Sequence, residues 1–494
     1  MSSAVKNIFQ EVVMPSPGIE MNFRPITSHH FIKATFCRRV RLAAPPCSIG
    51  ITDGSERGSY VPQSHLLKAI GRPHHIVNLM FQYYPEMENW PTQGVNWHGF
   101  YRNNELNKGD GYFPLVLEPG GRWGQAYLRQ IEDVRALGQE PQLTLTLHTH
   151  SPDEALIRIA ESLRPYAPMR IRINHECNGV WFYFNQVSGY REVSDFFIRF
   201  HRILHEYAPG IQTVACWNGP GDTIENPETP NPNRGMLTDD QLGPMFRIAD
   251  IISFDQYASL HYGWPDPAFD AAHPTHYFRV PFERWWQTLE DFHRDISELR
   301  GSDTPVEIHE INEDANLTGF EAQAGWITRF YREAARRKLS WLTNITFYQF
   351  RDRGGLGLEQ EDLHDATRYR ALPSLAAYRE AIDDPRFALC IEADNDGDSL
   401  LWQSPSHAQG VEYFYDVPAE TTCALLTGSS RHHLLIEHNG QWTLKPRGIE
   451  QFVLTREPGP CGLRIHIFTP PPDGRNNSNN GFASALDEPP MILI

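Results

Sequence analysis

The feature that most constrains the fold is a regular alternation of short apolar runs and amphipathic stretches across residues 47–382. Each apolar run has the length of a buried strand, and most of the stretches between them carry apolar residues at helical spacing. Eight runs are predicted to be strands, at residues 47–52, 76–83, 143–147, 169–174, 212–217, 251–255, 305–309 and 343–350. Strands that alternate with helices indicate an α/β fold with a parallel sheet.

Two observations favour a closed barrel over an open sheet. The number of predicted strands is eight, and no glycine-rich phosphate-binding turn follows the first of them. The intervening helices are expected at residues 62–70, 123–137, 151–163, 193–207, 241–248, 282–299, 319–338 and 372–382. The sequence therefore predicts a (β/α)8 TIM barrel, in which functional groups gather where the strands end.

The pattern changes after Pro385 to short alternating apolar and polar runs, which are typical of an antiparallel β-domain. We expect a barrel over residues 47–385 and a small sandwich-like β-domain over residues 386–468. Residues 1–46 lack clear periodicity and are expected to be an N-terminal extension. Residues 469–494 are rich in proline, asparagine and glycine and are expected to be a flexible tail.

Composition excludes several classes of partner. The formal net charge of −17 argues against nucleic acid and against an anionic membrane surface, both of which attract basic patches. The seven cysteines include no Cys-x-x-Cys pair, so free thiols are expected and no structural zinc or other cofactor is predicted. Residues 1–14 lack a secretory signal pattern, which gives an expectation of cytoplasmic location, with export by another route left open.

The stretch at residues 172–184 contains the strongest chemical signal. Its strand ends just before the carboxylate of Glu176, and the aromatic residues Trp181 and Phe182 follow closely. An acid beside flat rings suits hydrolysis of a bond between sugars, because the acid protonates the leaving oxygen while the rings hold the pyranose faces. Arg172 has the same strand parity as Glu176 and could act as a stabilising donor. The structural alternative is a glutamate that only forms a salt bridge at a strand end.

A second carboxylate is expected at the end of the seventh strand, where three glutamates compete. Glu307 lies in the middle of the strand with the opposite parity, and Glu313 falls in the following loop. Glu310 lies at the strand's end and is the preferred candidate. A separation of about 5–5.5 Å between the two carboxyl groups would indicate a retaining mechanism, and about 6.5–9.5 Å an inverting one.

The ends of the eight predicted strands together form a polar and aromatic set. We expect Trp217 and His148, which belong to this set, to contact sugar. The full set comprises Asp53, Tyr83, His148, Glu176, Trp217, Tyr257, Glu310 and Tyr348.

Residues 172–182 read Arg-x-x-His-Glu-x-Asn-Gly-x-Trp-Phe and resemble the acid/base strand of family 26 glycoside hydrolases, the β-mannanase family. Residues 250–257 and 304–310 are similar to the strands of that family that carry a tyrosine and the nucleophile. The resemblance implies a retaining (β/α)8 glycosidase with Glu176 as acid/base and Glu310 as nucleophile. It also implies that Tyr257 hydrogen-bonds Glu310 and that His175 contacts the sugar or the nucleophile. The expected substrate is a mannan- or glucan-type poly- or oligosaccharide.

Two other functions remain open. His148, His150 and His175 could bind a metal in a metal-dependent hydrolase, because a His-x-His pair at a barrel strand end can bind zinc. A carbohydrate-binding barrel without catalysis would carry the same aromatic residues. Metal analysis of the purified protein would distinguish the metal-dependent hydrolase from a glycosidase. A turnover assay would distinguish the carbohydrate-binding barrel from an enzyme.

Overall fold

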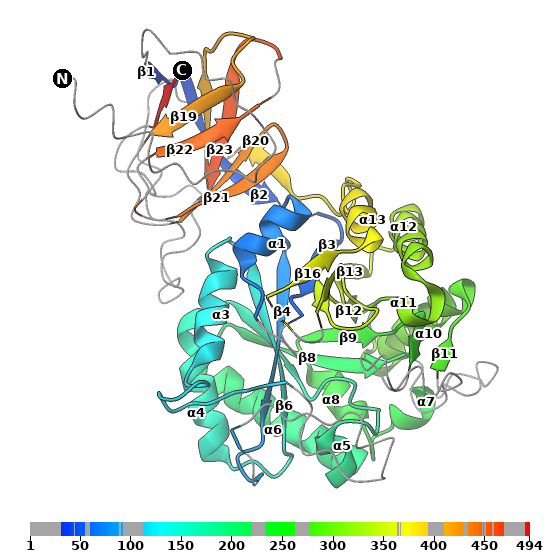
Figure 1. Cartoon of the computed structure of the whole chain (residues 1–494). Helices are drawn as coiled ribbons and strands as arrows, with labels where there is room; N and C mark the ends of the chain where they lie inside the picture. Colours follow the sequence, from blue (N-terminus) through cyan, green and yellow to red (C-terminus); the bar gives the residue numbers. More distant parts are fainter. Residues whose placement is uncertain are drawn as a thin grey trace.

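The computed structural model describes residues 31–43, 45–54, 60–87, 90–91, 112–219, 233–261, 277–362, 365, 367–393, 410–427, 433–446, 448, 451–456, 459–468 and 490–494. Residues 1–30 of the expected extension and 469–489 of the expected tail lie outside this set, as do Trp97, Phe100 and Tyr101 of the long loop after the second strand. Figure 1 shows the chain as a barrel with a separate β-sandwich at one end.

Eight parallel strands close into the predicted barrel. Each strand pairs with its neighbours in chain order, and β3 and β13, the first and last strands, pair with each other through Asn344–Phe347 and Ser48–Ile51. The strands are β3 (Ser48–Thr52), β4 (Ile76–Tyr83), β6 (Glu140–Leu147), β7 (Met169–Ile173), β8 (Ile211–Asn218), β9 (Ile251–Asp255), β12 (Val306–Glu310) and β13 (Leu342–Phe347). All eight strands that the sequence predicts are confirmed.

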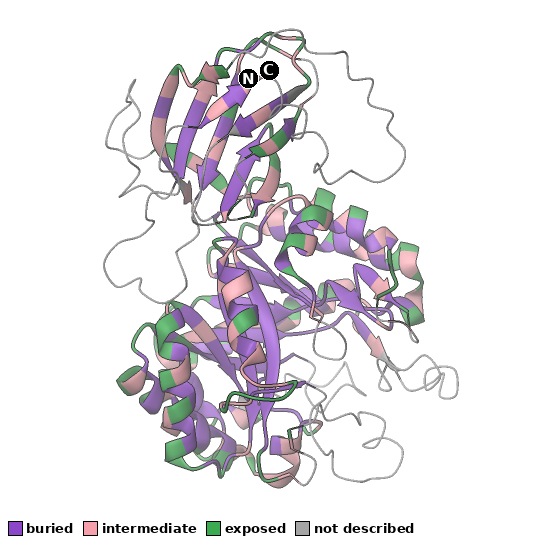
Figure 2. Cartoon of the chain, turned by 60° about the vertical axis from the view of Figure 1, so that its left-hand side comes forward, coloured by how far each residue is buried: buried purple, intermediate pink, exposed green. Residues whose placement is uncertain are grey.

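A layer of amphipathic helices surrounds the barrel. In Figure 2 the barrel strands are buried along most of their length, whereas the helices are exposed on their outer faces. This layer contains α1 (Gln63–Ile70), α3 (Ala126–Arg135), α4 (Asp153–Leu163), α6 (Tyr190–Tyr207), α8 (Gly243–Ile248), α10 (Phe282–Arg300), α12 (Phe320–Arg337) and α13 (Pro373–Ala381). Helix α10 ends at Gly301, whose φ of 68° is a left-handed conformation that glycine adopts without a Cβ clash. The eight helices predicted from the sequence are confirmed.

Short extra elements gather in the loops that follow the strands. They are β5 (Phe113–Pro114), α5 (Tyr183–Val187), α7 (Asn233–Met236), β10 (Ser259–His261), β11 (Tyr277–Arg279), α11 (Ala315–Thr318), β14 (Arg351–Asp352), β15 (Glu359–Glu361) and β16 (Tyr369–Ala371). One 3-10 turn, η2 (Arg164–Tyr166), follows α4 instead. The carboxyl end of the barrel is therefore the elaborated end, as expected for the end that carries a site.

The second domain is an antiparallel β-sandwich. One sheet has the order β17-β2-β18-β23-β20-β21, and the other has the order β1-β24-β19-β22. Its strands are β1 (Phe31–Lys33), β2 (Phe36–Ala43), β17 (Cys390–Ala393), β18 (Gly410–Tyr415), β19 (Cys423–Thr427), β20 (Leu434–His438), β21 (Gln441–Lys445), β22 (Gln451–Thr455), β23 (Leu463–Phe468) and β24 (Met491–Leu493). The antiparallel β-domain expected after Pro385 is present.

Both ends of the chain contribute to this sandwich, which differs from the expected extension and tail. Strand β2 lies between β17 and β18, and β24 lies between β1 and β19. Three arginines in β2 obscure the alternation of the strand in the sequence. Arg38, one of them, lies on the outer face of its sheet and donates to Glu412 of β18 at 3.1 Å. The strand is therefore paired structure rather than solvated surface.

A small apolar cluster joins the two domains. Leu67 of α1 and Leu137, which follows α3, pack with Val40, Leu435 and Phe468 of the sandwich. Leu137 lies shortly before β6, and β2 leads directly into β3, so the sandwich lies at the amino ends of the barrel strands. It is thus at the opposite end from the strand-end carboxylates. None of the described helices is long and apolar enough to cross a membrane.

Candidate active site

Glu176 lies on a tight turn that follows β7. Asn174 and Glu176 both adopt positive φ angles, 45° and 49°, which are uncommon for residues other than glycine. The side chain of Asn174 stabilises the turn, because it donates to the Leu147 carbonyl at 3.1 Å and accepts from the Leu147 amide at 2.7 Å. Arg172 and Glu176 were expected to lie on one face because side chains alternate along a strand. The turn interrupts the strand before Glu176, so this alternation does not extend to Glu176.

Two N–H donors hold the carboxyl group of Glu176. The indole of Trp181 donates to Oε2 at 2.7 Å, and the amide of Asn218 donates to Oε1 at 2.7 Å. Asn178 in turn fixes the backbone of Asn218, accepting from its N–H at 2.8 Å and donating to its carbonyl at 3.0 Å. Glu176 is only 6% exposed, so its orientation is set by the protein rather than by water.

Glu310 is the last residue of β12 and is 4% exposed. The guanidinium of Arg172 donates to its Oε1 at 2.5 Å, and the hydroxyl of Tyr257 donates to its Oε2 at 2.6 Å. Both contacts fix the orientation of the carboxyl group. The structure thus brings together Arg172, Tyr257 and Glu310, three of the residues proposed from the sequence.

Arg172 lies between two carboxylates inside the barrel. Besides Glu310, it binds Asp255 Oδ2 at 2.7 Å through Nη1 and Thr144 Oγ1 at 2.7 Å through Nε. Burial alone would lower the pKa of Arg172, but the charges of Asp255 and Glu310 raise it well above its ordinary value. Arg172 is therefore a permanent cation that neutralises part of the buried negative charge.

Three carboxyl groups converge at this point. One carboxyl oxygen from each of Glu176, Asp255 and Glu310 lies within 4.8 Å of the other two. The pKa of Glu176 is raised to about 8, chiefly by burial and then by the charge of Glu310, against the opposing effect of hydrogen bonds from Asn218 and Trp181. Glu176 is consequently protonated at neutral pH. Two neighbouring carboxyl groups in such different surroundings can divide acid and nucleophile roles.

His175 lies beside the pair and is neutral. Its Nε2 is 3.2 Å from the hydroxyl of Tyr112 and 3.8 Å from Glu310 Oε1. Burial lowers the pKa of His175 well below its ordinary value, and the charge of Arg172 lowers it further. Its ring centroid is 4.4 Å from that of Phe182. His175 is therefore oriented as an uncharged hydrogen-bonding group next to Glu310.

The structure places Trp217 away from the carboxylates, contrary to the sequence-based expectation. Trp217 is 1% exposed, and its ring packs against Phe246 of α8 and Phe292 of α10 at centroid distances of 5.7 and 5.9 Å. Neighbouring residues in a strand face opposite sides, so the next residue, Asn218, reaches the site instead. The prediction that Trp217 contacts sugar is wrong for this physical reason.

His148 lies at the strand end but is not brought to the glutamates by any described contact. Its ring neighbours are His150, at a centroid distance of 5.0 Å, and Tyr183, at 6.0 Å. Among the described residues, His148, His150 and His175 do not form a set of converging metal ligands. The geometry does not support the alternative of a metal-dependent hydrolase that uses these three histidines.

The site also contains residues that the sequence reasoning missed. Asp255 is the last residue of β9 and Asn218 the last of β8, so their strand-end positions were an available signal. Tyr112 comes from the long loop after β4, and no motif marked it as a partner of His175.

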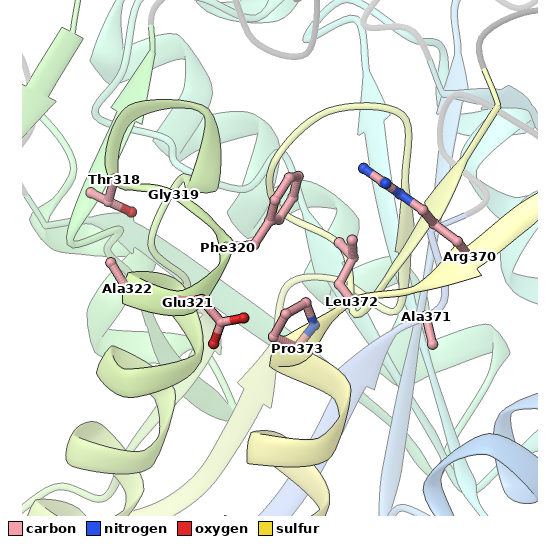
Figure 3. Close-up of a pocket in the computed structure, with 9 residues that line it drawn as sticks. All are labelled: Thr318, Gly319, Phe320, Glu321, Ala322, Arg370, Ala371, Leu372 and Pro373. Carbon is pink, nitrogen blue, oxygen red and sulfur yellow. The ribbon is translucent and has the colours of Figure 1, made fainter.

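The hollow in Figure 3 is a separate feature of the surface. It encloses about 580 Å³ between the start of α12 and the segment that joins β16 to α13. Phe320, Glu321, Arg370 and Leu372 line it, and the carboxylates of the barrel do not. The Arg370 guanidinium is bound to Gln360 Oε1 at 2.6 Å. This hollow is therefore not the candidate active site.

Replacing Arg172 with methionine is expected to lower the free energy of unfolding by about 3–5 kcal/mol, because it leaves two buried carboxylates without their cation. Urea unfolding at pH 7 measures this difference. Arg191→Met is the matched control, since Arg191 pairs with Asp195 on the exposed surface, where such an ion pair contributes little to stability. An Arg172→Met variant as stable as the control would contradict the proposed charge balance.

Comparison with known proteins gives a similarity of structure only. No family model matches the chain. No curated protein matches it either. Among solved structures, a GH26 β-mannanase from Bacteroides ovatus shares 11% identity over 69% of this chain and 90% of its own, with a TM-score of 0.42. A GH26 endo-β-1,4-mannanase from Bacillus sp. JAMB-750 shares 14% identity over 69% of this chain and 87% of its own, also at 0.42. A glucosidase from Croceicoccus marinus shares 9% identity over 88% of this chain and 98% of its own, again at 0.42.

Proposed function

We propose that this protein is a retaining glycoside hydrolase that cleaves β-glycosidic bonds in a mannan- or glucan-type poly- or oligosaccharide. The observation that carries the proposal is the pair Glu176 and Glu310, whose carboxyl oxygens lie within 4.8 Å at the carboxyl ends of β7 and β12. This separation supports direct attack by one carboxylate, because an inverting enzyme needs room for a water molecule between the two groups.

In the first step, Glu310 attacks the anomeric carbon while Glu176 gives its proton to the leaving oxygen. Arg172 and Tyr257 orient Glu310 for attack, through contacts at 2.5 and 2.6 Å. The raised pKa of Glu176, about 8, supports its role as the acid. The aglycone then departs and leaves a covalent glycosyl-enzyme.

In the second step, Glu176, now a carboxylate, removes a proton from water as the water attacks the glycosyl-enzyme. The bond to Glu310 breaks, the sugar leaves with its original anomeric configuration, and both carboxyl groups return to their starting state. The N–H groups of Trp181 and Asn218 stabilise the carboxylate form of Glu176 during this step. His175 and Tyr112, which contact each other beside Glu310, would bind sugar hydroxyls.

The direct test is release of reducing ends from β-mannan, mixed-linkage β-glucan, β-xylan and their short oligomers, with Glu176→Gln assayed in parallel. We expect release from at least one substrate by the wild type and loss with the variant. Release at the same rate by both proteins would refute the assigned acid. Sugar binding without any release would favour a carbohydrate-binding barrel over an enzyme.

A further inference from the structure

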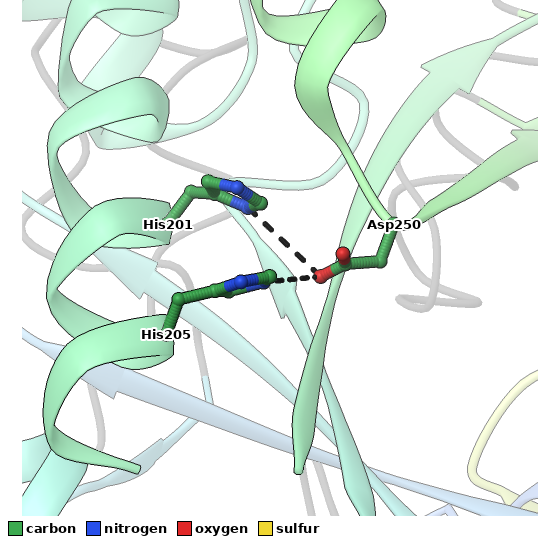
Figure 4. A group of neighbouring side chains, drawn as sticks. All are labelled: His201, His205 and Asp250. Atoms are coloured by element: carbon green, nitrogen blue, oxygen red, sulfur yellow. Dashed lines mark hydrogen bonds and ion pairs between the residues drawn. The ribbon is translucent and has the colours of Figure 1, made fainter. Parts of the chain in front are cut away.

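A second group of polar side chains lies outside the barrel, far from the carboxylates of the site. His201 and His205 occupy neighbouring turns of α6, and Asp250 directly precedes β9. Figure 4 shows both imidazoles directed toward the Asp250 carboxylate. Thr213, which contacts this group, is near the start of β8, so the group lies at the amino ends of the strands. This end of a barrel generally serves stability rather than chemistry.

The spacing of the three side chains suits a metal ion. Asp250 Oδ2 is 2.9 Å from His205 Nε2 and 3.9 Å from His201 Nδ1, and one ligand atom from each residue lies within 4.8 Å of the others. In a tetrahedral zinc site with bonds of about 2.0–2.1 Å, neighbouring ligand atoms are about 3.3 Å apart. The observed distances fall on either side of this value, so small side-chain rotations would bring all three atoms to one ion.

Thr213 orients this group from behind. Its backbone N–H and its hydroxyl donate to Asp250 Oδ2 at 2.8 and 2.9 Å, and the hydroxyl is 2.7 Å from His201 Nδ1. Such outer contacts fix the direction of metal-binding side chains. His205 is about half exposed, which leaves the group accessible to an ion and to a completing water molecule.

We propose that His201, His205 and Asp250 bind a divalent transition-metal ion of the zinc class. Two imidazoles and one carboxylate favour zinc, nickel or copper over magnesium or calcium, which prefer all-oxygen sites. The bound ion would connect α6 with the strand β9 and stabilise the outside of the barrel. This proposal does not depend on the glycosidase activity.

The test is titration of the chelator-treated full chain with ZnCl2 by isothermal calorimetry, together with thermal unfolding with and without ZnCl2. We expect one saturable site and an increase in Tm of a few degrees for the wild type. Asp250→Asn and His205→Ala should each weaken this binding by at least about 10-fold and remove the Tm increase. Titration with CoCl2 should give the visible absorption of a low-symmetry cobalt site in the wild type only.

Asp303→Asn is the matched control. Asp303 and His293 form a similar histidine–aspartate pair at 2.9 Å. This pair belongs to no candidate set of metal ligands among the described residues. The control should bind ZnCl2 like the wild type. Because His205 is exposed, His205→Ala should fold even if Asp250→Asn does not. Equal zinc affinity in the wild type and His205→Ala, or no binding by the wild type, would overturn the proposal and leave a simple ion pair.

Discussion

Glu310→Ala is expected to reduce kcat by at least about 10⁴-fold while sugar affinity changes little. Such a loss corresponds to about 5.4 kcal/mol of activation free energy. The reason is that no other described carboxylate beside Glu176 is held by both Arg172 and a tyrosine hydroxyl. Initial rates on the substrate found in the reducing-end assay, with calorimetric titration of a short oligomer, measure the two quantities separately.

Chemical rescue makes this prediction specific to a nucleophile. Sodium azide can occupy the space of the missing Glu310 side chain and attack the anomeric carbon from the same face. With an activated aryl glycoside as donor, the product should be a glycosyl azide of inverted configuration. Glu313→Gln is the control, since Glu313 competed for this role in the sequence but lies beyond the strand end. Full activity of Glu310→Ala, or loss of activity in Glu313→Gln alone, would show that Glu310 is not the nucleophile.

Glu176→Gln is expected to lower kcat about 10²–10⁴-fold on natural sugars, because glutamine cannot transfer a proton to the leaving oxygen. A dinitrophenyl leaving group needs no such proton, so cleavage of its bond should slow far less. The wild-type rate should fall as the pH rises through about 8, the pKa to which burial raises Glu176. This alkaline decline should be absent from the variant, and pH–rate profiles on both substrates show it.

The same shift predicts a change in stability. The pKa of Glu176 is 4.5 in the unfolded chain and about 8 in the folded protein. Ionisation of Glu176 therefore lowers the free energy of unfolding progressively as the pH rises from 4.5, and this loss of stability levels off above about 8. Glu176→Gln should therefore resist urea better than the wild type at pH 9 and show a smaller difference at pH 5. Equal unfolding midpoints at both pH values would contradict the raised pKa.

The barrel could be predicted from the sequence because its strands are continuous apolar runs separated by helices with a clear apolar face. Glu310 could be located because it directly follows the apolar run that predicts the seventh strand. The orientation of Trp217 was predicted wrongly, because a shift of one residue along a strand moves a side chain to the opposite face. The alternation of side chains along a strand does not apply to Asn174 and Glu176, because both have a left-handed backbone conformation. Asn174 stabilises this turn through contacts with strand β6.

The pairings of β2 and β24 were hidden for a different reason. Neither strand has its partner nearby in the chain, so local periodicity carries little information about either pairing. The arginines of β2 also suggested a solvated segment, whereas Arg38 is neutralised by Glu412 across the sheet. The cluster of His201, His205 and Asp250 could not be predicted from the sequence either, because Asp250 is distant in sequence from the two histidines.

The way in which the sandwich closes has a consequence for synthesis. Strand β1 pairs with β24 in the described structure, and β2 pairs with β17 and β18, all of which follow the barrel in the chain. On the ribosome, these first strands must therefore wait without partners while the whole barrel emerges. Unpaired strands invite intermolecular association, and charged side chains on a strand discourage it. Arg38 and Arg39 would thus protect β2 from such association until β17 and β18 emerge.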